Sequence, residues 1–100
     1  MAMTQDPLDA LAECRERIDR IDAKLVELLN QRTAVAEQIG SIKRVSNLPV
    51  YEPKREDQVF ANVTSGNKGP LTNEAVRRIF ERIIDEMRRV QKSRMEEKDQ

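Results

Sequence analysis

The sequence predicts an all-α protein built from three helices. Charged residues make up 36% of the 100-residue chain and aromatic residues only 3%, which is typical of helices with solvated faces rather than of a sheet sandwich. Apolar residues recur three and four residues apart over long stretches, as on one face of a helix. Breaker clusters at 46–49 and 66–70 separate three such stretches. We therefore expect a long, a short and a medium helix in one domain spanning residues 1–100, with a core of about 8–92.

The first predicted helix runs from about Leu8 to Arg44. Asp6 and Pro7 suit its start, because aspartate is a good N-cap and proline fits the first helical turn. A helix of about 37 residues spans about 55 Å at about 1.5 Å per residue, whereas a compact domain of this length is about 26 Å across. We therefore expect a second copy of the chain to cover it. The residues to be covered form a seam of coiled-coil type: Leu11, Cys14, Ile18, Ile21, Leu25, Leu28, Arg32, Val35, Ile39 and Ile42.

The second and third helices are bounded by proline, glycine and capping residues. The second is expected to open within Glu52–Glu56, with Pro53 in its first turn, and to stop near Ser65–Gly66, with an apolar edge at Val59, Phe60 and Val63. Thr72 or Asn73 caps the third, and residues beyond Ser93 are polar on every side and are expected to fray. The predicted inward face of the third helix consists of Val76, Ile79, Phe80, Ile83, Ile84, Met87, Val90 and Gln91.

Composition argues against several classes of function. The 18 basic and 18 acidic residues balance, and neither sign forms a long block, so nothing indicates nucleic-acid binding. No apolar run is long enough to span a membrane, and the N-terminus does not resemble a signal peptide. With no histidine and one cysteine, the usual metal sites and histidine-based catalysis are not expected. Cys14 is expected to be a small core residue, and a lone cysteine fits a reducing, cytoplasmic setting.

Several polar residues on or beside the apolar faces are candidates for a binding site. Arg32 lies within the seam, where a cation needs either a ligand or a structural ion pair, for instance with Glu56. Arg15 and Lys43 flank the seam, either as coiled-coil surface charges or as site residues. Gln91, one turn beyond Met87, is either a rim residue or a ligand contact. A pocket with several cations and no nucleophile suits a dicarboxylate, and would catalyse by orienting it and stabilising developing charge.

Several segments of the chain, taken in order and with their spacing, carry a resemblance: Arg15, Ile18–Asp22, Leu28–Arg32, Ile39–Lys43, Val50–Glu56, Asn67–Leu71, Ile79–Ile84 and Gln91. Over roughly residues 8–92 they resemble the all-helical AroQ-type chorismate mutase family. The resemblance implies an intertwined homodimer of three-helix protomers with two sites, each built from both chains. It also implies the Claisen rearrangement of chorismate to prephenate in aromatic amino acid biosynthesis, without cofactor or metal.

The resemblance also implies roles for individual residues. Arg32 and Arg15 of the partner subunit would bind the two substrate carboxylates. Lys43 and Gln91 would flank the ether oxygen, and Lys43, Gln91 and Arg32 form the catalytic set. The other substrate-binding positions are Glu52 (accepting from the substrate hydroxyl), Arg55 (supporting the carboxylate region), Glu56 (engaging the hydroxyl or orienting the cations) and Met87.

Two positions depart from the family pattern. Glu52 stands where many relatives have aspartate, which lengthens the side chain by one methylene. Met87 stands where a small polar residue is common, so a hydrogen bond to a carboxylate is lost there. Both departures bear on substrate affinity more than on reaction type.

The spacing of the cations supports a site shared between two chains. Arg15 and Lys43 are separated by 28 residues, or about 42 Å along a straight helix. No small ligand touches both from one chain, so Arg15 would have to come from an antiparallel partner. Two other functions stay open: an isochorismate–pyruvate lyase, which shares the fold and the cationic pocket, and a catalytically silent dimerisation or regulatory module. Association with a regulatory partner enzyme is also open.

Overall fold

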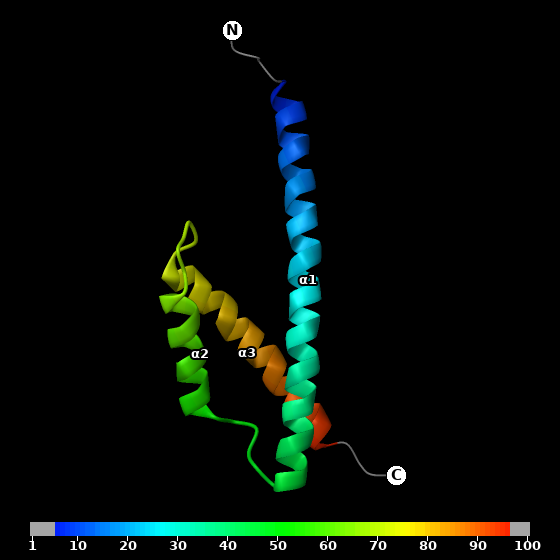
Figure 1. Ribbon diagram of the computed structural model, residues 1–100, viewed down its shortest axis with the longest axis vertical. Coiled ribbons are helices and arrows are strands. Elements are labelled where there is room, and N and C mark those ends of the chain that lie inside the picture. Colours follow the sequence, from blue (N-terminus) through cyan, green and yellow to red (C-terminus); the bar gives the residue numbers. More distant parts are fainter. Residues whose placement is uncertain (1–5, 97–100) are drawn as a thin grey trace. The chain divides into compact units, whose positions relative to one another are not determined.

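The computed structural model describes residues 6–96 and contains three α-helices (Figure 1). They are α1 (Pro7–Ser46), α2 (Pro53–Ser65) and α3 (Asn73–Met95), and the described residues contain no strand. The predicted all-α class and the order of long, short and medium helices are confirmed. The chain divides into two units, residues 1–32 and 33–100, and the boundary falls within α1.

The described part of the first unit is the N-terminal portion of α1. The backbone N–H of Leu8 donates to Asp6 Oδ1 at 2.9 Å, so Asp6 is the predicted N-cap with Pro7 following it. The apolar seam residues of this unit are exposed in the single chain, from 43% for Leu11 to 59% for Leu28. Cys14 is exposed as well. The expectation that Cys14 is a core residue is therefore not met within one chain.

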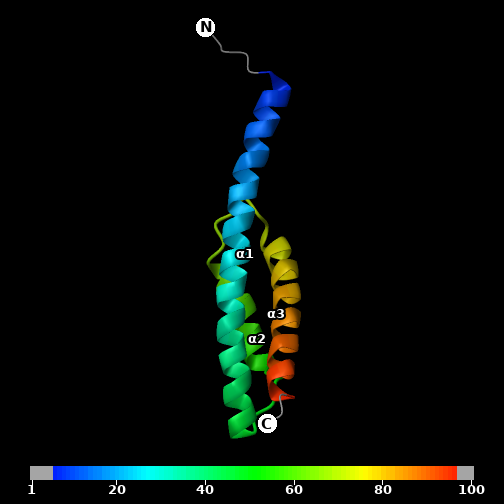
Figure 2. The same cartoon turned by 90° about the vertical axis from the view of Figure 1, so that its right-hand side faces the viewer.

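The second unit consists of residues 33–46 of α1 together with α2 and α3. The red end of α3 lies against the green end of α1 in both views (Figures 1 and 2). Its buried apolar residues are Ala36 from α1, Val59 from α2, and Val76, Ile84 and Met87 from α3. Predicted inward positions are thus largely correct, because three- and four-residue spacing keeps them on the packed side of each helix.

Ile79 departs from that prediction, since it is 49% exposed. It lies on the apolar face of α3, but the described residues leave about half of it uncovered. The end of α3 also differs from expectation. The helix continues two residues past Ser93 to Met95, with Glu96 as its C-cap, and residues 97–100 of the tail expected to fray lie outside the described residues.

Gly40 allows the closest approach between α1 and α3. A Cβ at this position would lie 2.9 Å from Arg94 Cβ and 3.0 Å from Gln91 Cα. These distances are shorter than van der Waals contact, so only glycine lets the two backbones come this close without a shift. Gly40 is therefore the point that sets the spacing of α1 and α3.

The end of α1 sends the chain back toward α2. Asn47 has a positive φ of 55°, and the N–H of Leu48 donates to the carbonyl of Lys43 at 2.8 Å. The N–H of Asn47 bonds to the carbonyl of Arg44, which completes a Schellman motif with asparagine in the left-handed position. The helix therefore stops one turn after Lys43, and the loop that follows returns along it.

The loop between α2 and α3 is organised by Asn67. Its Nδ2 donates to the carbonyl of Leu71 at 2.7 Å and to Asn73 Oδ1 at 2.8 Å, while its Oδ1 accepts from the N–H of Gly69. Thr72 then caps α3, because its Oγ1 accepts from the N–H of Ala75 at 3.1 Å. Of the two residues expected to cap this helix, Thr72 is the N-cap.

Candidate active site

Lys43 is the buried charge at the centre of the candidate site. The residue is only 5% exposed, and its ammonium contacts three oxygen acceptors. These are Glu52 Oε1 at 2.6 Å, Gln91 Oε1 at 2.8 Å and the carbonyl of Val50 at 3.0 Å. An ammonium has three N–H donors, so each has an acceptor. The burial of this cation is therefore offset by one carboxylate and two neutral oxygens.

Glu52 reaches Lys43 from the loop that precedes α2. It occupies the N-cap position of α2 but makes no side-chain capping bond. Its carboxylate turns to Lys43 instead, while its side chain remains 50% exposed. The return of the chain after Asn47 places both Val50 and Glu52 beside the last turns of α1. Three separate backbone segments therefore meet at one ammonium.

Gln91 reaches the same ammonium from α3. Because its Oε1 accepts from Lys43, its amide nitrogen is the end that can donate to a ligand. The close approach at Gly40 brings the backbone of Gln91 against α1, three residues before Lys43. The buried ammonium and the amide together form a pair of donors held by helix packing. Such a pair can stabilise negative charge that develops on an oxygen atom.

A second charged cluster joins α2, α3 and the loop between α1 and α2. Arg88 Nε donates to Glu56 Oε2 at 2.7 Å, and Arg88 Nη2 pairs with Glu56 Oε1. Arg88 Nη1 also contacts Asp85 Oδ1 at 2.9 Å, and the guanidinium lies 5.4 Å from the centre of the Tyr51 ring. The hydrogen bond with Glu56 raises the pKa of Arg88 above its ordinary value, and burial opposes this with a smaller effect.

Arg88 is the residue of this region that the sequence pattern missed. The ion pair suggested for Glu56 was with Arg32, whereas the structure pairs Glu56 with Arg88. The two residues are 32 positions apart, and no periodicity links them. The available signal was that Arg88 follows the buried Met87 on α3, one turn before Gln91.

The remaining predicted site residues are placed separately. Arg15 is exposed and Arg32 half-buried on the part of α1 that belongs to the first unit, and Arg32 has interactions within the chain. Arg55 is exposed and donates to Gln58 Oε1 at 3.4 Å. Met87 is buried, and its sulfur accepts a weak hydrogen bond from the Thr33 hydroxyl at 3.8 Å. Of the eight predicted positions, the structure joins Lys43, Glu52 and Gln91 directly.

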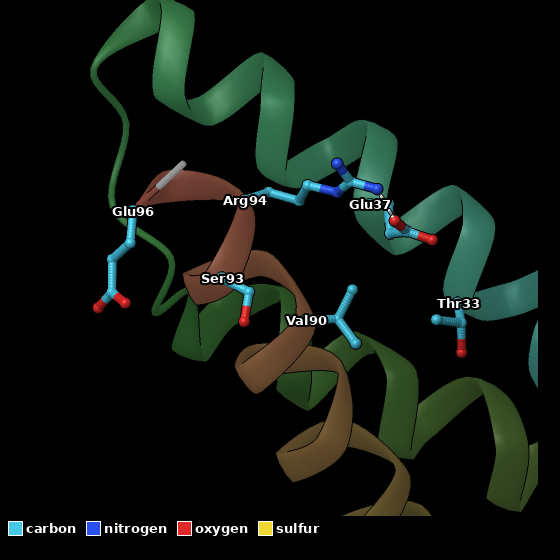
Figure 3. A pocket seen from close by; sticks show the side chains of 6 residues that line it. All are labelled: Thr33, Glu37, Val90, Ser93, Arg94 and Glu96. Carbon is cyan, nitrogen blue, oxygen red and sulfur yellow. Dashed lines mark hydrogen bonds and ion pairs between the residues drawn. The ribbon is translucent and has the colours of Figure 1, made fainter. Parts of the chain in front are cut away.

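An open cavity of about 550 Å³ within the second unit is lined by residues of α1 and of the C-terminal part of α3. Figure 3 shows Arg94 reaching from α3 to Glu37 on α1, with which it forms an ion pair across the cavity wall. A smaller cavity of about 350 Å³ shares Glu37 and Arg94. No predicted site residue lines either cavity. The larger one is lined by Thr33, Glu37, Val90, Ser93, Arg94 and Glu96.

Residues 6–96 contain neither a metal-binding cluster nor a membrane-spanning helix. No group of three or more histidine, cysteine, aspartate or glutamate side chains in that range is arranged to hold a metal ion. None of the helices there combines the length and the apolar character needed to cross a membrane.

The sequence matches the family described as chorismate mutase type II over residues 14–92. It is 40% identical over 81 residues to a bifunctional chorismate mutase/prephenate dehydratase of Aquifex aeolicus, covering 77% of this chain and 22% of that protein. The chain thus spans about a fifth of the length of that curated relative. It is 30% identical over 91 residues to a chorismate mutase of Methanocaldococcus jannaschii, covering 90% of this chain and 92% of that protein.

Solved structures agree with the sequence relatives. The chorismate mutase of Helicobacter pylori in complex with prephenate superposes with a TM-score of 0.83 at 26% identity, covering 91% of this chain and 99% of that one. The form II chorismate mutase of Thermus thermophilus gives a TM-score of 0.81 at 29% identity, covering 83% and 94%. The resemblance identified from the sequence motifs is confirmed: the chain belongs to the chorismate mutase type II family.

Proposed function

We propose that this protein converts chorismate to prephenate. The observation that carries the proposal is the meeting of Lys43, Gln91 and Glu52, in which a buried ammonium and an amide lie side by side. Two relatives support it: one of nearly the same length that bears the name chorismate mutase, and a structural neighbour that holds prephenate. We place the reaction in aromatic amino acid biosynthesis and in the cytoplasm.

The reaction is a Claisen rearrangement, in which one C–O bond breaks while one C–C bond forms. Electrons move around a six-membered ring, so no proton, nucleophile or cofactor is needed. As the C–O bond breaks ahead of C–C bond formation, negative charge builds on the ether oxygen. Lys43 Nζ and the amide nitrogen of Gln91 would donate to that oxygen and stabilise the transition state more than the ground state. Lys43 would exchange one of its present acceptors for the ether oxygen.

The remaining predicted residues would bind and orient the substrate. Arg32 and Arg15 of the partner subunit would each hold one carboxylate, which fixes the two reacting ends of the molecule near each other. Glu52 would accept a hydrogen bond from the substrate hydroxyl. Arg55 would support the carboxylate region, and Met87 would form part of the wall of the site. Glu56 would engage the substrate hydroxyl or orient the cations.

We further propose that the working unit is a homodimer with two shared sites. Along the whole of α1, large apolar seam residues are exposed in the single chain, including Ile21 at 57%, Val35 at 54% and Ile42 at 59%. A long apolar stripe of this kind marks an interaction surface, and its coiled-coil spacing suits a second helix of the same sequence. An antiparallel partner would bring its Arg15 to the site of Lys43.

A direct assay tests the proposed reaction. Purified protein is mixed with chorismate in the presence of a metal chelator, and loss of chorismate is followed by absorbance while prephenate is identified by chromatography. Turnover to prephenate is expected. No turnover of chorismate together with release of pyruvate from isochorismate would indicate the lyase, and inactivity on both substrates would indicate a silent helical module.

The shared site is tested by mixing two inactive variants. Arg15→Ala and Lys43→Ala homodimers should each lose nearly all activity, since each lacks one cation in both sites. In a heterodimer both changes fall in one site and the other is intact. After unfolding and refolding of an equal mixture, about a quarter of wild-type activity should return, because half of the dimers carry one good site of two. Heterodimers that form and stay inactive would refute the shared site.

A further inference from the structure

Arg88 connects three segments of the second unit, yet the proposed chemistry leaves it without a role. It lies on α3, binds Glu56 on α2 through two nitrogens, and stands over the ring of Tyr51 in the loop before α2. Its third contact is Asp85, one turn earlier on its own helix. The Glu56 side chain is 16% exposed and that of Arg88 39% exposed. The pair is therefore partly removed from water, where its interaction is stronger than at the surface.

The geometry of the pair fixes the orientation of the Glu56 carboxylate, in addition to balancing its charge. The two nitrogens meet the two oxygens of Glu56 side by side, which is the two-pronged arrangement that arginine makes with carboxylates. Each carboxylate oxygen still has a second lone pair, so Glu56 can accept a further hydrogen bond from a ligand. Asp85 and Tyr51 restrain the guanidinium in turn. Glu56 is thus held in one orientation before any ligand arrives.

The charge of Glu56 matters because the proposed substrate carries two carboxylates. A half-buried anion without a partner would repel a dianion that binds nearby, and screening by solvent is weak there. Paired with Arg88 through two nitrogens, Glu56 presents an oriented acceptor whose charge is offset, while Asp85, which shares Arg88, has a side chain that is 50% exposed and is therefore better screened by water. Tyr51, which Arg88 overlies, directly precedes Glu52, so the same guanidinium also supports the segment that carries the second acceptor.

We propose that Arg88 is a positioning residue of the ligand site: it orients Glu56 and cancels its charge, so that a dicarboxylate can bind beside it. This inference rests on the proposed function, which assigns Glu56 to the site. A residue with a purely structural role, which only holds α2 and α3 together, would make the same contacts. The two roles differ in what happens to ligand affinity in protein that remains folded.

The test compares Arg88→Met with Arg89→Met. Arg89 is the neighbouring residue on α3, its side chain is 69% exposed, and its contact with Glu86 is long at 3.5 Å. Both variants remove one positive charge from the same turn, so their difference isolates the contacts that Arg88 makes with Glu56, Asp85 and Tyr51. For each we measure kcat and KM with chorismate, the Kd of prephenate by titration calorimetry, and the melting temperature. Arg88→Met should raise KM and Kd about tenfold, with kcat within about threefold, and Arg89→Met should change neither by more than about twofold.

Repeating the comparison in a Glu56→Gln background separates action through Glu56 from direct contact with the ligand. Glutamine has no charge to cancel, so Arg88→Met should then alter Kd by less than about threefold. An equal loss in both backgrounds would mean that Arg88 touches the ligand itself, and would overturn the proposal. A lower melting temperature with unchanged Kd would overturn the proposal in favour of a purely structural role for Arg88.

Arg88→Lys provides a second variant if Arg88→Met does not fold or if proteins carrying Glu56→Gln bind too weakly to measure. Lysine keeps the charge but loses the two-pronged contact. Its Kd should lie between those of wild type and Arg88→Met, and a Kd equal to that of wild type would show that orientation of Glu56 is unimportant. Wild-type protein that neither turns over chorismate nor binds prephenate would instead contradict the proposed function, which the wild-type assay reveals before any variant is made.

Discussion

Arg15 and Lys43 belong to the same row of α1, yet their surroundings differ completely. Positions on this row recur every seven residues from Arg15 through Asp22, Leu29 and Ala36 to Lys43. Lys43 is 5% exposed and has acceptors from α3 and from the loop before α2, whereas Arg15 is exposed. The chain covers the C-terminal end of this row with its own third helix and leaves the N-terminal end uncovered. The cluster of Lys43, Glu52 and Gln91 is formed within a single chain, whereas the proposed contribution of Arg15 would come from a second chain.

A charge placed in the exposed seam should have the largest effect. Ile21 is 57% exposed and Ala23 is also exposed, so in a lone chain Ile21→Asp and Ala23→Asp would be equally harmless. If a second chain covers the seam, Ile21→Asp buries an unpaired charge at a cost of about 3–5 kcal/mol, which corresponds to a loss of about 150- to 4,000-fold in dimer affinity. Ala23→Asp, on the polar side, should have little effect.

Sedimentation velocity over a range of protein concentrations measures the association of both variants, and chorismate turnover measures the sites. Ile21→Asp should become monomeric at concentrations where wild type is dimeric, and should lose activity with the dimer. Wild-type protein that is itself monomeric and active would refute both the partner chain and the shared site.

Lys43→Met breaks the half of the site that the chain completes alone. Methionine has nearly the length of lysine and no charge, so helix packing is retained while the donor to the ether oxygen is lost. The value of kcat should fall about 100- to 1,000-fold, as for removal of a donor that acts on developing charge. KM should change much less, because the contact strengthens only in the transition state.

Steady-state kinetics and sedimentation together give a sharp contrast with the seam variant. Lys43→Met should remain dimeric and inactive, whereas Ile21→Asp should lose both properties. A large rise in KM with unchanged kcat would mean that Lys43 binds substrate without taking part in the rearrangement.

Gly40→Ala should have an intermediate effect, because it moves a site residue without removing one. The added Cβ would lie 3.0 Å from Gln91 Cα, so α3 must shift away from α1. This shift would move Gln91 away from Lys43. Such overpacking costs about 1–3 kcal/mol, partly offset by the better helix propensity of alanine. We expect a fall of about tenfold in kcat.

Gly66→Ala is the matched control for this change. Gly66 has a φ of −81°, which alanine adopts, and an added Cβ would meet only Asn62 O of its own helix at 3.2 Å. Its kcat should stay within about twofold of wild type. Equal kinetic effects of the two substitutions would mean that the spacing at Gly40 does not position Gln91.

The differences between sequence and structure follow the same division between local and distant contacts. Helix limits were predictable to within two residues because Asp6, Pro53 and Thr72 act through their nearest neighbours. The fold class followed from the three- and four-residue spacing of apolar residues, and the family followed from short segments of sequence. Both kinds of pattern are local in the chain. Ile79 was misplaced because periodicity identifies an apolar face without showing what covers each part of it.

The site divides in the same way. The meeting of Lys43, Glu52 and Gln91 was predictable only through the resemblance, since three distant segments supply it. The pair of Arg88 and Glu56 was missed because nothing in their spacing links them, and the importance of Gly40 is visible only when the opposing backbone is seen. Long-range contacts of this kind depend on how elements pack, which residue spacing does not encode.

Thr72→Ala should have the smallest effect and should separate stability from chemistry. The Thr72 hydroxyl accepts from the N–H of Ala75 at the start of α3, at the end of the helix remote from Gln91. Loss of this cap should lower the free energy of unfolding by about 1 kcal/mol, measured by urea denaturation. Since the close contact at Gly40 holds the other end of α3 against α1, kcat and KM should stay within about twofold of wild type. A tenfold loss of kcat would mean that the position of Gln91 is set along the whole helix, and that the self-completed half of the site is less independent than its contacts indicate.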